Sequence, residues 1–474
     1  MIIDVIRKIV LVLNYFFAGY LVVYSTYLII SNIFGSIKMF RNRRLEQLHN
    51  VLEHEFYYPI SILVPAYNEG ITVVQTVKNL LKLDYRLYEI VVIDDGSKDN
   101  TKQLLLDNFP FKQEVGRPIR YAIPCKTVKE IYTAKVNNIL IVLISKENGG
   151  SKSDAINAGI NVATYPYFIN MDGDEILQKD ALKYACRAIL ESDNVIGVGG
   201  NLKISNNVQF RDAMPVSSKL GKNLIVNMQV LEYGRGFVGA KIFQNILNAN
   251  LIIAGGYGIF LKSAVIEVGG YDTSSKGEDM ELTLRLHRHY RKNKKRYSMK
   301  YVPDSVCWTQ GPESFRDLRK QRERWSYGLI QTISKYRGMI LNPRYGIIGM
   351  FMLPYTIMYE LLNPILMLVG WGVILWSAID KTLNLPFVLY LYLMYVCFGI
   401  VLTMISFLDK AYMKIDFFSV LDVIKCLLMG IVEAFFFRPY LALIGFISYF
   451  KYKKIATGAW FSPERVKVNS LDDD

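Results

Sequence analysis

Cysteine and histidine are scarce in this sequence of 474 residues, which contains five cysteines and four histidines. The cysteines form no Cys-x-x-Cys pair, and the histidines are not spaced as metal ligands. The chain also lacks the GxxxxGK[ST] sequence of P-loop proteins, the G-x-S-x-G turn of α/β-hydrolases and any internal repeat. These absences argue against a disulfide framework, a zinc site, a P-loop NTPase, a serine hydrolase and a transporter built from inverted repeats.

Hydrophobic residues, in contrast, are abundant and make up 51% of the chain. An apolar run from Ile9 to Phe34 is long enough to cross the hydrocarbon layer of a bilayer, which is about 30 Å thick. Arg7 and Lys8 precede this run, and a larger basic cluster follows it, namely Lys38, Arg41, Arg43 and Arg44. By the positive-inside rule, we expect the domain that follows to lie in the cytoplasm.

The formal net charge of +14 predicts anionic partners. Nucleic acid, anionic lipids and phosphorylated substrates would all suit such a charge. Because membrane segments are present, a lipid bilayer and a phosphate-bearing substrate are the favoured partners, and nucleic acid is not expected.

Residues 57–311 show the pattern of a soluble α/β domain. Short apolar runs end in polar turns and are followed by segments with helical spacing, as in "ISILVPAYNEG", "YEIVVIDDGSKDNT" and "PYFINMDGDEIL". This alternation predicts βαβ units around a mostly parallel sheet, whose ligands bind at the carboxyl ends of the strands.

Two pairs of carboxylates follow these predicted strands. Asp172 and Asp174 enclose a glycine in "DGD", a pattern that suits Mg²⁺ or Mn²⁺ bound between protein carboxylates and a diphosphate. A solvated acidic loop is the plain alternative. Asp94 and Asp95 come directly after another strand, where an Asx-turn or a helix cap would explain them equally well.

Two predicted helix starts also carry charged residues. Lys152 follows a glycine pair in "GGSKSDAINAG", and free backbone N–H groups beside a lysine favour phosphate binding. Glu278 and Asp279 begin another helix, where one carboxylate could serve as a general base. An ordinary loop-to-helix junction and simple capping are the structural alternatives.

The string "RKQRERW" at residues 319–325 lies on a predicted amphipathic helix. Arg322 and Arg324 can bind phosphate oxygens, and Trp325 offers an apolar face to a sugar ring. An interfacial helix with snorkelling arginines and a belt tryptophan explains the same string. When all the motifs are considered together, we assign neither Arg322 nor Glu323 to the chemistry.

Together and in order, "PAYNEG", "IDDGS", "GGSKSDAINAG", "DGD", "GED" and "QRERW" resemble the signature of membrane-embedded family 2 glycosyltransferases. This group includes cellulose, hyaluronan and poly-N-acetylglucosamine synthases, and the flanking residues are similar to its bacterial exopolysaccharide and cell-wall branch. The resemblance covers residues 57–340 and the apolar flanks. It implies an α/β GT-A-type glycosyltransferase domain with a mostly parallel sheet, fused to α-helical transmembrane and interfacial helices.

The resemblance also assigns roles residue by residue. Asp279 would be the catalytic base with Glu278 beside it, and Asp174 would be the metal ligand together with Asp172. The residues that would bind UDP and the donor sugar are Ala66, Tyr67, Glu69, Asp94, Asp95, Lys152, Asp172, Gln321 and Arg324. The residues that would bind the acceptor are Gly255, Gly256, Tyr257 and Trp325. Gly277 departs from the family, which usually has Thr there, and we expect this to alter loop flexibility more than the base.

The function implied by this resemblance is that of a processive, inverting β-glycosyltransferase in a bacterial plasma membrane. It would polymerise a UDP-hexose with Mg²⁺ or Mn²⁺ and pass the β-linked polysaccharide outward through its own membrane segments. UDP-glucose, giving a β-glucan, is the favoured donor, and UDP-N-acetylglucosamine is next. The alternative is a non-processive enzyme that adds one sugar to a lipid or lipid-linked acceptor. No regulatory domain is recognisable, so regulation would require an accessory subunit or regulatory protein.

The expected organisation has six parts. They are a transmembrane helix at 1–40, a cytoplasmic linker at 41–56, the glycosyltransferase domain at 57–311, interfacial helices at 312–344, apolar helices at 345–450 and a cytoplasmic tail at 451–474. Within the last apolar block, residues 417–450, four ionisable residues and a basic sequence after the block predict a broken, re-entrant or interfacial segment.

Overall fold

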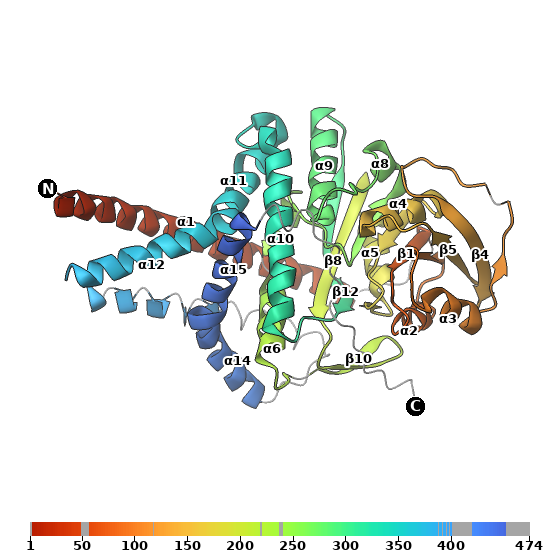
Figure 1. The fold of residues 1–474 in the computed structure, drawn as a ribbon, viewed down its shortest axis with the longest axis horizontal. Coiled ribbons are helices and arrows are strands. Elements are labelled where there is room, and N and C mark those ends of the chain that lie inside the picture. Colours follow the sequence, from red (N-terminus) through yellow and green to blue (C-terminus); the bar gives the residue numbers. More distant parts are fainter. Residues whose placement is uncertain are drawn as a thin grey trace.

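The computed structural model describes most of the chain (Figure 1). The described residues are 2–48, 56–116, 118–218, 220–236, 240–386, 388–390, 392–394, 396–397, 399–400 and 420–451.

A ten-stranded sheet organises the soluble domain, with the strand order β3-β4-β5-β2-β1-β6-β11-β8-β12-β7. Its centre is parallel and consists of β5 (Ile139–Lys146), β2 (Tyr88–Asp94), β1 (Ile60–Ala66) and β6 (Tyr167–Asn170). The outer strands are β3 (Lys112–Gln113), β4 (Val128–Val136), β11 (Gly258–Leu261), β8 (Val195–Ile204), β12 (Ser298–Thr309) and β7 (Ile176–Leu177). A separate hairpin joins β9 (Val208–Arg211) to β10 (Met214–Ser218). The predicted mostly parallel sheet is therefore confirmed.

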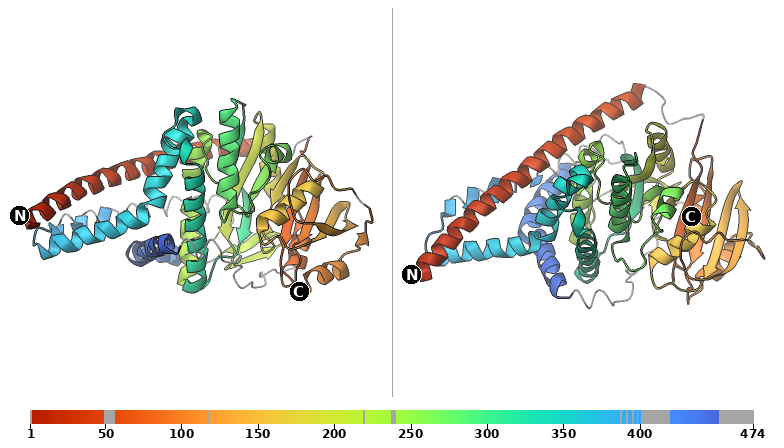
Figure 2. Two further views of the ribbon diagram at one scale, coloured as in Figure 1. Left: turned by 45° about the horizontal axis from the view of Figure 1, so that its top comes forward. Right: turned by 90° about the horizontal axis from the view of Figure 1, so that it is seen from above.

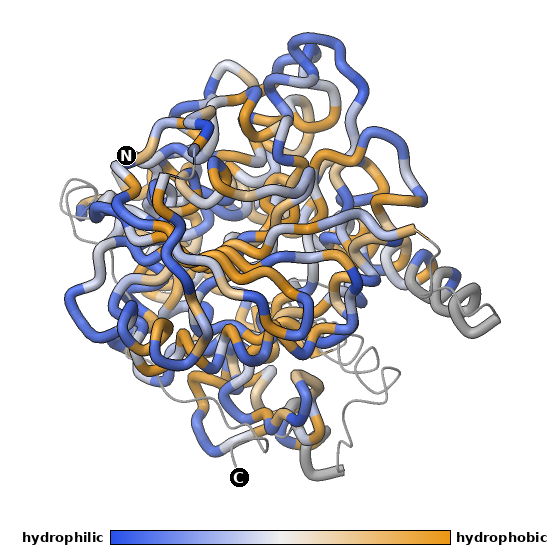
Figure 3. Tube along the Cα trace, turned by 90° about the vertical axis from the view of Figure 1, so that its right-hand side faces the viewer, coloured by the Kyte–Doolittle hydropathy of each residue, from blue (hydrophilic) through white to orange (hydrophobic). Residues whose placement is uncertain are grey.

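Helices cover both faces of this sheet, so the central strands are buried on two sides. This burial explains why β1 and β2 are almost continuously apolar and lack the alternation of a half-exposed strand. One face packs against α2 (Val73–Leu80), α3 (Thr101–Asn108) and α5 (Ala181–Leu190). The other face packs against α4 (Lys152–Val162), α8 (Lys262–Glu267) and α9 (Glu278–Lys292). Figure 3 shows the hydrophobic strands at the centre with hydrophilic segments around them.

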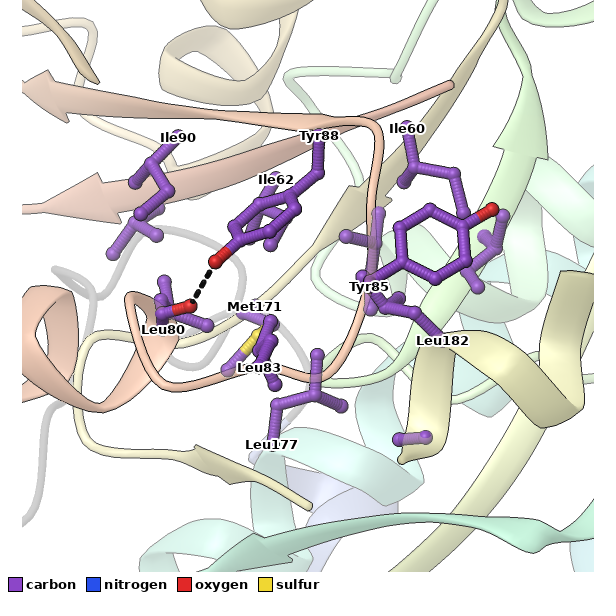
Figure 4. Close-up of a cluster of buried hydrophobic side chains, with 14 of the residues drawn as sticks. Ile60, Ile62, Leu80, Leu83, Tyr85, Tyr88, Ile90, Met171, Leu177 and Leu182 are labelled. Carbon is purple, nitrogen blue, oxygen red and sulfur yellow. Dashed lines mark hydrogen bonds between the residues drawn. The ribbon is translucent and has the colours of Figure 1, made fainter. Parts of the chain in front are cut away.

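Several tyrosine hydroxyls in this core donate to backbone carbonyls, which satisfies these buried polar groups. In Figure 4, Tyr88 lies among Ile62, Ile90 and Leu83, and its hydroxyl donates to the carbonyl of Leu80, at 2.8 Å. This bond ties the end of α2 to the start of β2. The core therefore fixes the connection through which the chain enters β2.

The remaining helices connect the sheet to the apolar part of the chain. On the soluble side they are α6 (Leu224–Arg235), α7 (Lys241–Ile246), α10 (Phe315–Lys335), η2 (Arg337–Met339) and η3 (Pro343–Tyr345). The apolar part comprises α1 (Ile2–Leu48), η4 (Ile348–Met352), α11 (Leu353–Thr356), η5 (Ile357–Leu361), α12 (Asn363–Ile379), α14 (Val420–Val432), η6 (Glu433–Phe437) and α15 (Arg438–Phe450).

Two described helical segments are long and apolar enough to cross a membrane, Ile3–Lys38 and Leu427–Phe450. The segments Ile348–Leu361 and Asn363–Ile379 make a third only if this pair, bent by 52°, counts as one span. Helix α12 runs antiparallel to α1, as Figures 1 and 2 show. The two helices are joined near the N-terminus by an ion pair between Arg7 and Asp380, at 2.8 Å.

The structure changes two of the expected boundaries. Helix α1 continues to Leu48, past the expected end of the transmembrane helix at residue 40 and into the expected linker. In the last apolar block, the described elements α14, η6 and α15 follow one another without interruption, and a bend of 52° lies instead in the first apolar block, between Leu361 and Asn363. The re-entrant or interfacial placement of the last block stays a prediction. Residues 452–474, which carry most of the expected tail, and residues 401–419 lie outside the described part.

Candidate active site

The carboxyl ends of the central strands bring the predicted donor-binding residues to one edge of the sheet. Ala66 ends β1 and is in register with Asp94, which ends β2. Asp94 is buried and accepts hydrogen bonds from the Ser97 amide at 3.0 Å and the Ser145 hydroxyl at 3.4 Å. The turn interpretation of Asp94 is therefore correct, and it is compatible with a site because the same turn holds the carboxylate at the sheet edge.

The segment after β1 lies against the DGD loop. Glu69 is buried and Tyr67 is 42% exposed. The Thr76 hydroxyl donates to the Gly173 carbonyl at 2.6 Å, and a Cβ on Gly173 would lie 3.5 Å from Cγ of Glu69. The PAYNEG segment and the DGD loop, about one hundred residues apart in sequence, thus lie side by side at the proposed site.

Asp95 faces inward to an ion pair that the sequence did not reveal. Its carboxylate pairs with Lys146, the last residue of β5, and accepts from the Gly149 amide at 3.0 Å. Lys146 also pairs with Asp154 at 2.6 Å. Burial raises the pKa of Asp95, although Lys146 opposes that rise. The structure therefore gives Asp95 a role in holding the loop before α4, and the signal for it was a lysine that closes an apolar strand.

Lys152 lies beside the DGD loop at the start of α4. It pairs with Asp172 and donates to the Gly255 carbonyl at 3.1 Å, which also accepts from Asn170 at 2.7 Å. Burial disfavours the charge on Lys152, but Asp172, Glu278 and Glu175 outweigh burial and raise its pKa. The lysine is therefore a buried cation, as a diphosphate site would need, and in this structure carboxylates neutralise it.

The DGD loop contains one buried and one accessible carboxylate. Asp174 is 4% exposed, whereas the Asp172 side chain is 39% exposed. Glu175, which the sequence analysis did not single out, is buried and accepts from the Asp172 amide at 2.9 Å. Burial and its two aspartate neighbours raise the pKa of Glu175 well above its ordinary value, whereas Lys152 and the Asp172 amide oppose this rise.

Divalent metal ions need more oxygen ligands than these two aspartates supply. Among the described residues, no cluster of three His, Cys, Asp or Glu side chains could hold an ion alone. Hard oxygen donors at a phosphate-binding edge nevertheless fit Mg²⁺ or Mn²⁺, provided that a diphosphate completes the coordination.

The two carboxylates at the start of α9 face the loop that precedes β11. A Cβ on Gly255 would lie 3.5 Å from Cβ of Asp279 and 3.6 Å from Oε1 of Glu278. Glu278 is 7% exposed, and burial together with Asp279 raises its pKa. Asp279 is the more accessible of the two. The arrangement thus offers one carboxylate to a ligand and keeps its neighbour buried.

The two residues after Gly255 differ in their relation to the site. Steric crowding explains why position 256 is a glycine, whereas the side chain of Tyr257 points away from the site. A Cβ on Gly256 would lie 1.9 Å from the Glu175 carboxyl group. Tyr257 is 1% exposed, and its hydroxyl meets the Ser305 hydroxyl in the core. The predicted acceptor role of Tyr257 gains no support from this position, where its ring supports the loop from beneath.

Helix α10 presents Trp325, which is 40% exposed. The guanidinium carbon of Arg322 lies 4.3 Å from the centre of the Trp325 ring, and both terminal nitrogens of Arg322 donate to the Glu232 carboxylate of α6 at 2.7 Å. Arg322, to which the sequence analysis assigned no part in the chemistry, braces the tryptophan through a cation–π contact. Glu232 was missed, since it lies 90 residues away.

Gln321 and Arg324 lie on the same helix. The amide oxygen of Gln321 is buried and accepts no hydrogen bond within the described residues. The charge of Arg324 opposes the rise in the pKa of Glu278, which places this guanidinium near the start of α9. A buried acceptor and a cation therefore face the region between α9 and α10.

Two glycines set the distance between α9 and α10. A Cβ on Gly277 would lie 3.0 Å from Cα of Gly328, and a Cβ on Gly328 would lie 2.9 Å from Cα of Gly277. Glycine at position 277 therefore allows the two backbones to touch. This contact explains why glycine replaces the threonine that is usual in the family better than a change in loop flexibility does. Lys335 closes the same interface by pairing with Asp272 at 2.6 Å and Glu281 at 2.5 Å.

Comparison with known proteins agrees with this arrangement. Residues 58–328 match the family described as "Glycosyltransferase like family 2". The poly-β-1,6-N-acetyl-D-glucosamine synthase of Staphylococcus aureus (strain COL) is 32% identical over 315 residues, which cover 66% of this chain and 65% of that protein. The synthase of the same name from Staphylococcus epidermidis is 30% identical over 316 residues, which cover 65% of each chain. The chain thus matches somewhat less than two thirds of the length of these relatives.

Among solved structures, a mannosyltransferase from Pyrobaculum calidifontis in complex with GDP-Man and Mn²⁺ has a similar fold. The TM-score is 0.50 at 15% identity, and the match covers 87% of this chain and 98% of that one. At this identity the likeness concerns the fold, and it confirms the predicted GT-A-type architecture.

Proposed function

The chain belongs to glycosyltransferase-like family 2, and from this premise we propose that it polymerises N-acetylglucosamine from UDP-N-acetylglucosamine into a β-1,6-linked polysaccharide. The observation that carries the proposal is the 32% identity to a poly-β-1,6-N-acetyl-D-glucosamine synthase across the domain that contains the site. UDP-glucose and a β-glucan product, which the sequence analysis favoured, find no support among these relatives.

The donor would bind along the carboxyl edge of the sheet. Ala66, Tyr67, Glu69 and Asp94 surround the space for the uridine, and Asp95 keeps the neighbouring loop in place. Lys152 and Arg324 would hold the diphosphate, and the unpaired amide oxygen of Gln321 would accept a hydrogen bond from the donor. Cations fixed before the reaction stabilise the charge that develops on the departing UDP without reorganising.

Asp174 and Asp172 would hold Mg²⁺ or Mn²⁺ together with the diphosphate. When bound, the ion supplies Lewis-acid stabilisation of the leaving group. Lys152 already neutralises Asp172, so the donor and ion would have to displace or share this pair.

Asp279 would act as the general base toward the acceptor. Its carboxylate would take the proton from the acceptor hydroxyl while that oxygen attacks the anomeric carbon, and the bond from this carbon to the β-phosphate oxygen would break as UDP leaves. One displacement of this kind inverts an α-linked donor sugar to a β-linked product. Trp325 would support the terminal acceptor sugar on its exposed face, with Gly255 and Gly256 beside it.

The apolar helices support a multi-pass location in a bacterial plasma membrane with the site on the cytoplasmic side. Their direct packing on α10 would let the growing chain pass from Trp325 toward the membrane. Tyr440 of α15 donates to the Phe315 carbonyl at the start of α10, at 3.1 Å, and Lys451 pairs with Glu323 at 3.0 Å. An accessory subunit or regulatory protein would act on this assembly from outside.

The test is polymer synthesis by the purified full chain in lipid nanodiscs. The protein is incubated with Mg²⁺ or Mn²⁺ and with each of several labelled UDP-sugars, and the products are separated by length and digested with linkage-specific glycanases. We expect long products from UDP-N-acetylglucosamine that only a β-1,6-specific enzyme degrades, and no products after chelation of the metal.

Two results would contradict the proposal. Long products from UDP-glucose alone would reject the donor assignment. Products that carry a single added sugar would reject polymerisation and would favour the non-processive alternative. The Asp279→Asn variant serves as the control for contaminating transferases.

A further inference from the structure

A basic pocket lies where α1, α7 and β12 meet, away from the proposed donor site. It has a volume of about 390 Å³. Its wall contains three cations, Lys38 and Arg41 of α1 and Lys300 of β12, and three apolar side chains, Phe34, Ile37 and Ile246. The pocket thus combines a positive rim with an apolar wall.

The three cations of this pocket form no ion pair within the described residues, in contrast to Arg7 at the other end of α1, which pairs with Asp380. Burial, and after it the charge of Lys38, lowers the pKa of Lys300, and the more weakly acting charge of Glu191 opposes this. Two like charges therefore face one another at the rim, an arrangement that an anion would relieve.

The position of the pocket along α1 matches the headgroup layer of a bilayer. Lys8 and Lys38 are separated by 30 residues, or about 45 Å of α-helix at 1.5 Å per residue. A bilayer including both headgroup layers is roughly 40–45 Å thick. Lys38 is also the last residue of the candidate span. If Lys8 lies in one headgroup layer, Lys38 lies in the other.

The apolar wall is strongly exposed, with Phe34 at 52%, Ile37 at 59% and Ile246 at 48%. Free phosphate would leave these side chains in water. A phospholipid would cover them with its acyl chain while its phosphate met the cations, so one molecule would satisfy both halves of the pocket.

We propose that this pocket binds the headgroup of an anionic phospholipid. Lys38, Arg41 and Lys300 surround its phosphate, and Phe34 and Ile37 contact the start of its acyl chain. The lipid ties α1 to α7, whose first residue, Lys241, donates to the Ile252 carbonyl at 3.0 Å, close to the Gly255 loop. This site does not depend on the proposed glycosyl transfer.

Native mass spectrometry of the full chain, released from nanodiscs of phosphatidylglycerol and phosphatidylcholine, tests the site. We expect the parent to retain phosphatidylglycerol selectively. Each Lys or Arg near an anionic surface strengthens association roughly fivefold. The variant K38Q/R41Q/K300Q should therefore bind it at least about tenfold more weakly. The matched control K129Q/K292Q/R296Q removes three exposed cations elsewhere and should bind like the parent.

Three results would overturn the proposal: unchanged retention by K38Q/R41Q/K300Q, equal loss in the control, or equal retention of phosphatidylcholine. Displacement of phosphatidylglycerol by millimolar inorganic phosphate would identify a free phosphate site and would also overturn it. The variant K38Q/R41Q, which changes only one helix, replaces the triple variant if that protein does not fold. Because lipid retention requires no UDP-sugar, its outcome is separate from that of the polymer assay.

Discussion

Each carboxylate at the site is held in a different environment, and these environments separate their roles. Asp174 and Glu278 are buried, Asp172 is paired with Lys152, and Asp279 is accessible beside Gly255. Burial and its aspartate neighbours raise the pKa of Glu175. Carboxylates that are close together in this site therefore differ in burial, in ion pairing and in the direction of their pKa shifts, as different proposed roles would require.

The Asp279→Asn variant tests the base at this scale. We expect polymer synthesis to fall about 10²- to 10⁴-fold, the usual contribution of general base catalysis, because the amide cannot accept the acceptor proton. Binding of UDP-N-acetylglucosamine, measured by calorimetry, should remain. Glu267→Gln, which changes a surface carboxylate paired with Lys295, is the control. Normal activity of Asp279→Asn would refute the assignment.

Arg322 is expected to act by positioning Trp325. In Arg322→Leu the indole loses its cation–π partner and Glu232 loses both donors, so the ring is no longer held in place. We expect shorter polymers and a higher KM for added oligosaccharide, whereas the KM for UDP-N-acetylglucosamine stays within about twofold. Arg319→Leu removes an exposed pair with Glu323 on the same helix and should leave both unchanged. An increase confined to the donor KM would contradict positioning of the acceptor.

Among the helices, the contact between α9 and α10 decides how the base meets the Q-x-x-R-W segment. Backbone touches backbone at Gly277 and Gly328, and Lys335 joins Asp272 and Glu281 across the same interface. A side chain added at either glycine would collide with backbone atoms, which cannot move aside as a flexible side chain could. Gly277 and Gly328 therefore determine how closely α9 and α10 approach each other.

Gly328→Ala should separate the two helices. The new Cβ would lie 2.9 Å from Cα of Gly277, and we expect a loss of about 1–3 kcal/mol in the free energy of unfolding together with a clear drop in activity. Gly338→Ala places its Cβ where no atom lies within 4 Å and is the control. Melting temperature and polymer yield report the two effects, and a neutral Gly328→Ala would show that the backbones need not touch.

The ion pair between Lys335 and Asp272 should make the stability of the protein depend on pH in the acid range. Burial opposes the charge on Asp272, but Lys335 and Ser274 lower its pKa to about 2. A carboxyl group with a lowered pKa stabilises the folded state above its ordinary value near 4 and loses this effect as the pH falls toward 2. We expect Asp272→Asn to cost about 1 kcal/mol at pH 6, allowing for solvent screening, and only a small part of that at pH 2, where the carboxyl group of the folded state is about half protonated. A difference in melting temperature as large at pH 2 as at pH 6 would contradict this origin.

Across the whole molecule, α6 connects the catalytic domain to the last apolar segment. Glu232 holds Arg322 of α10, and one turn later Arg235 pairs with the buried Glu433 of η6, which also receives Arg438 at 3.0 Å. Apolar residues of α6, α10 and α14 pack around these pairs. A shift of the membrane helices would therefore reach Trp325 through α6.

Replacing Glu433 by Leu should weaken this connection. The change leaves Arg235 buried without its carboxylate, and we expect a cost of about 3 kcal/mol, as is usual when one partner of a buried pair is removed. The double variant R235M/E433L should cost less than the sum of the two single changes, because Arg235 is then not left buried without its carboxylate, although Arg438 still loses its partner. Melting temperatures in detergent of the parent and the three variants measure this coupling. If the losses in stability of the two single variants simply added up in the double variant, Arg235 and Glu433 would not couple α6 to the last apolar segment.

The family and the edge of the sheet that carries the site could be predicted from the sequence alone. Apolar runs ending in Asp94 and in the DGD sequence are local patterns, and parallel strands necessarily bring their carboxyl ends together. The matched family and the confirmed sheet follow from these patterns. The chemical roles assigned to individual residues remain predictions that the experiments above address.

Only the tertiary structure decided which polar groups pair and which side chains face the site. Arg322 meets Glu232 across 90 residues, Lys146 engages Asp95, Tyr257 turns into the core, and the bend of the apolar helices lies beside Pro364. Local periodicity shows which residues are apolar, but the partner of a buried charge and the direction of a loop side chain depend on segments distant in sequence. Those contacts exist only once the layers have packed.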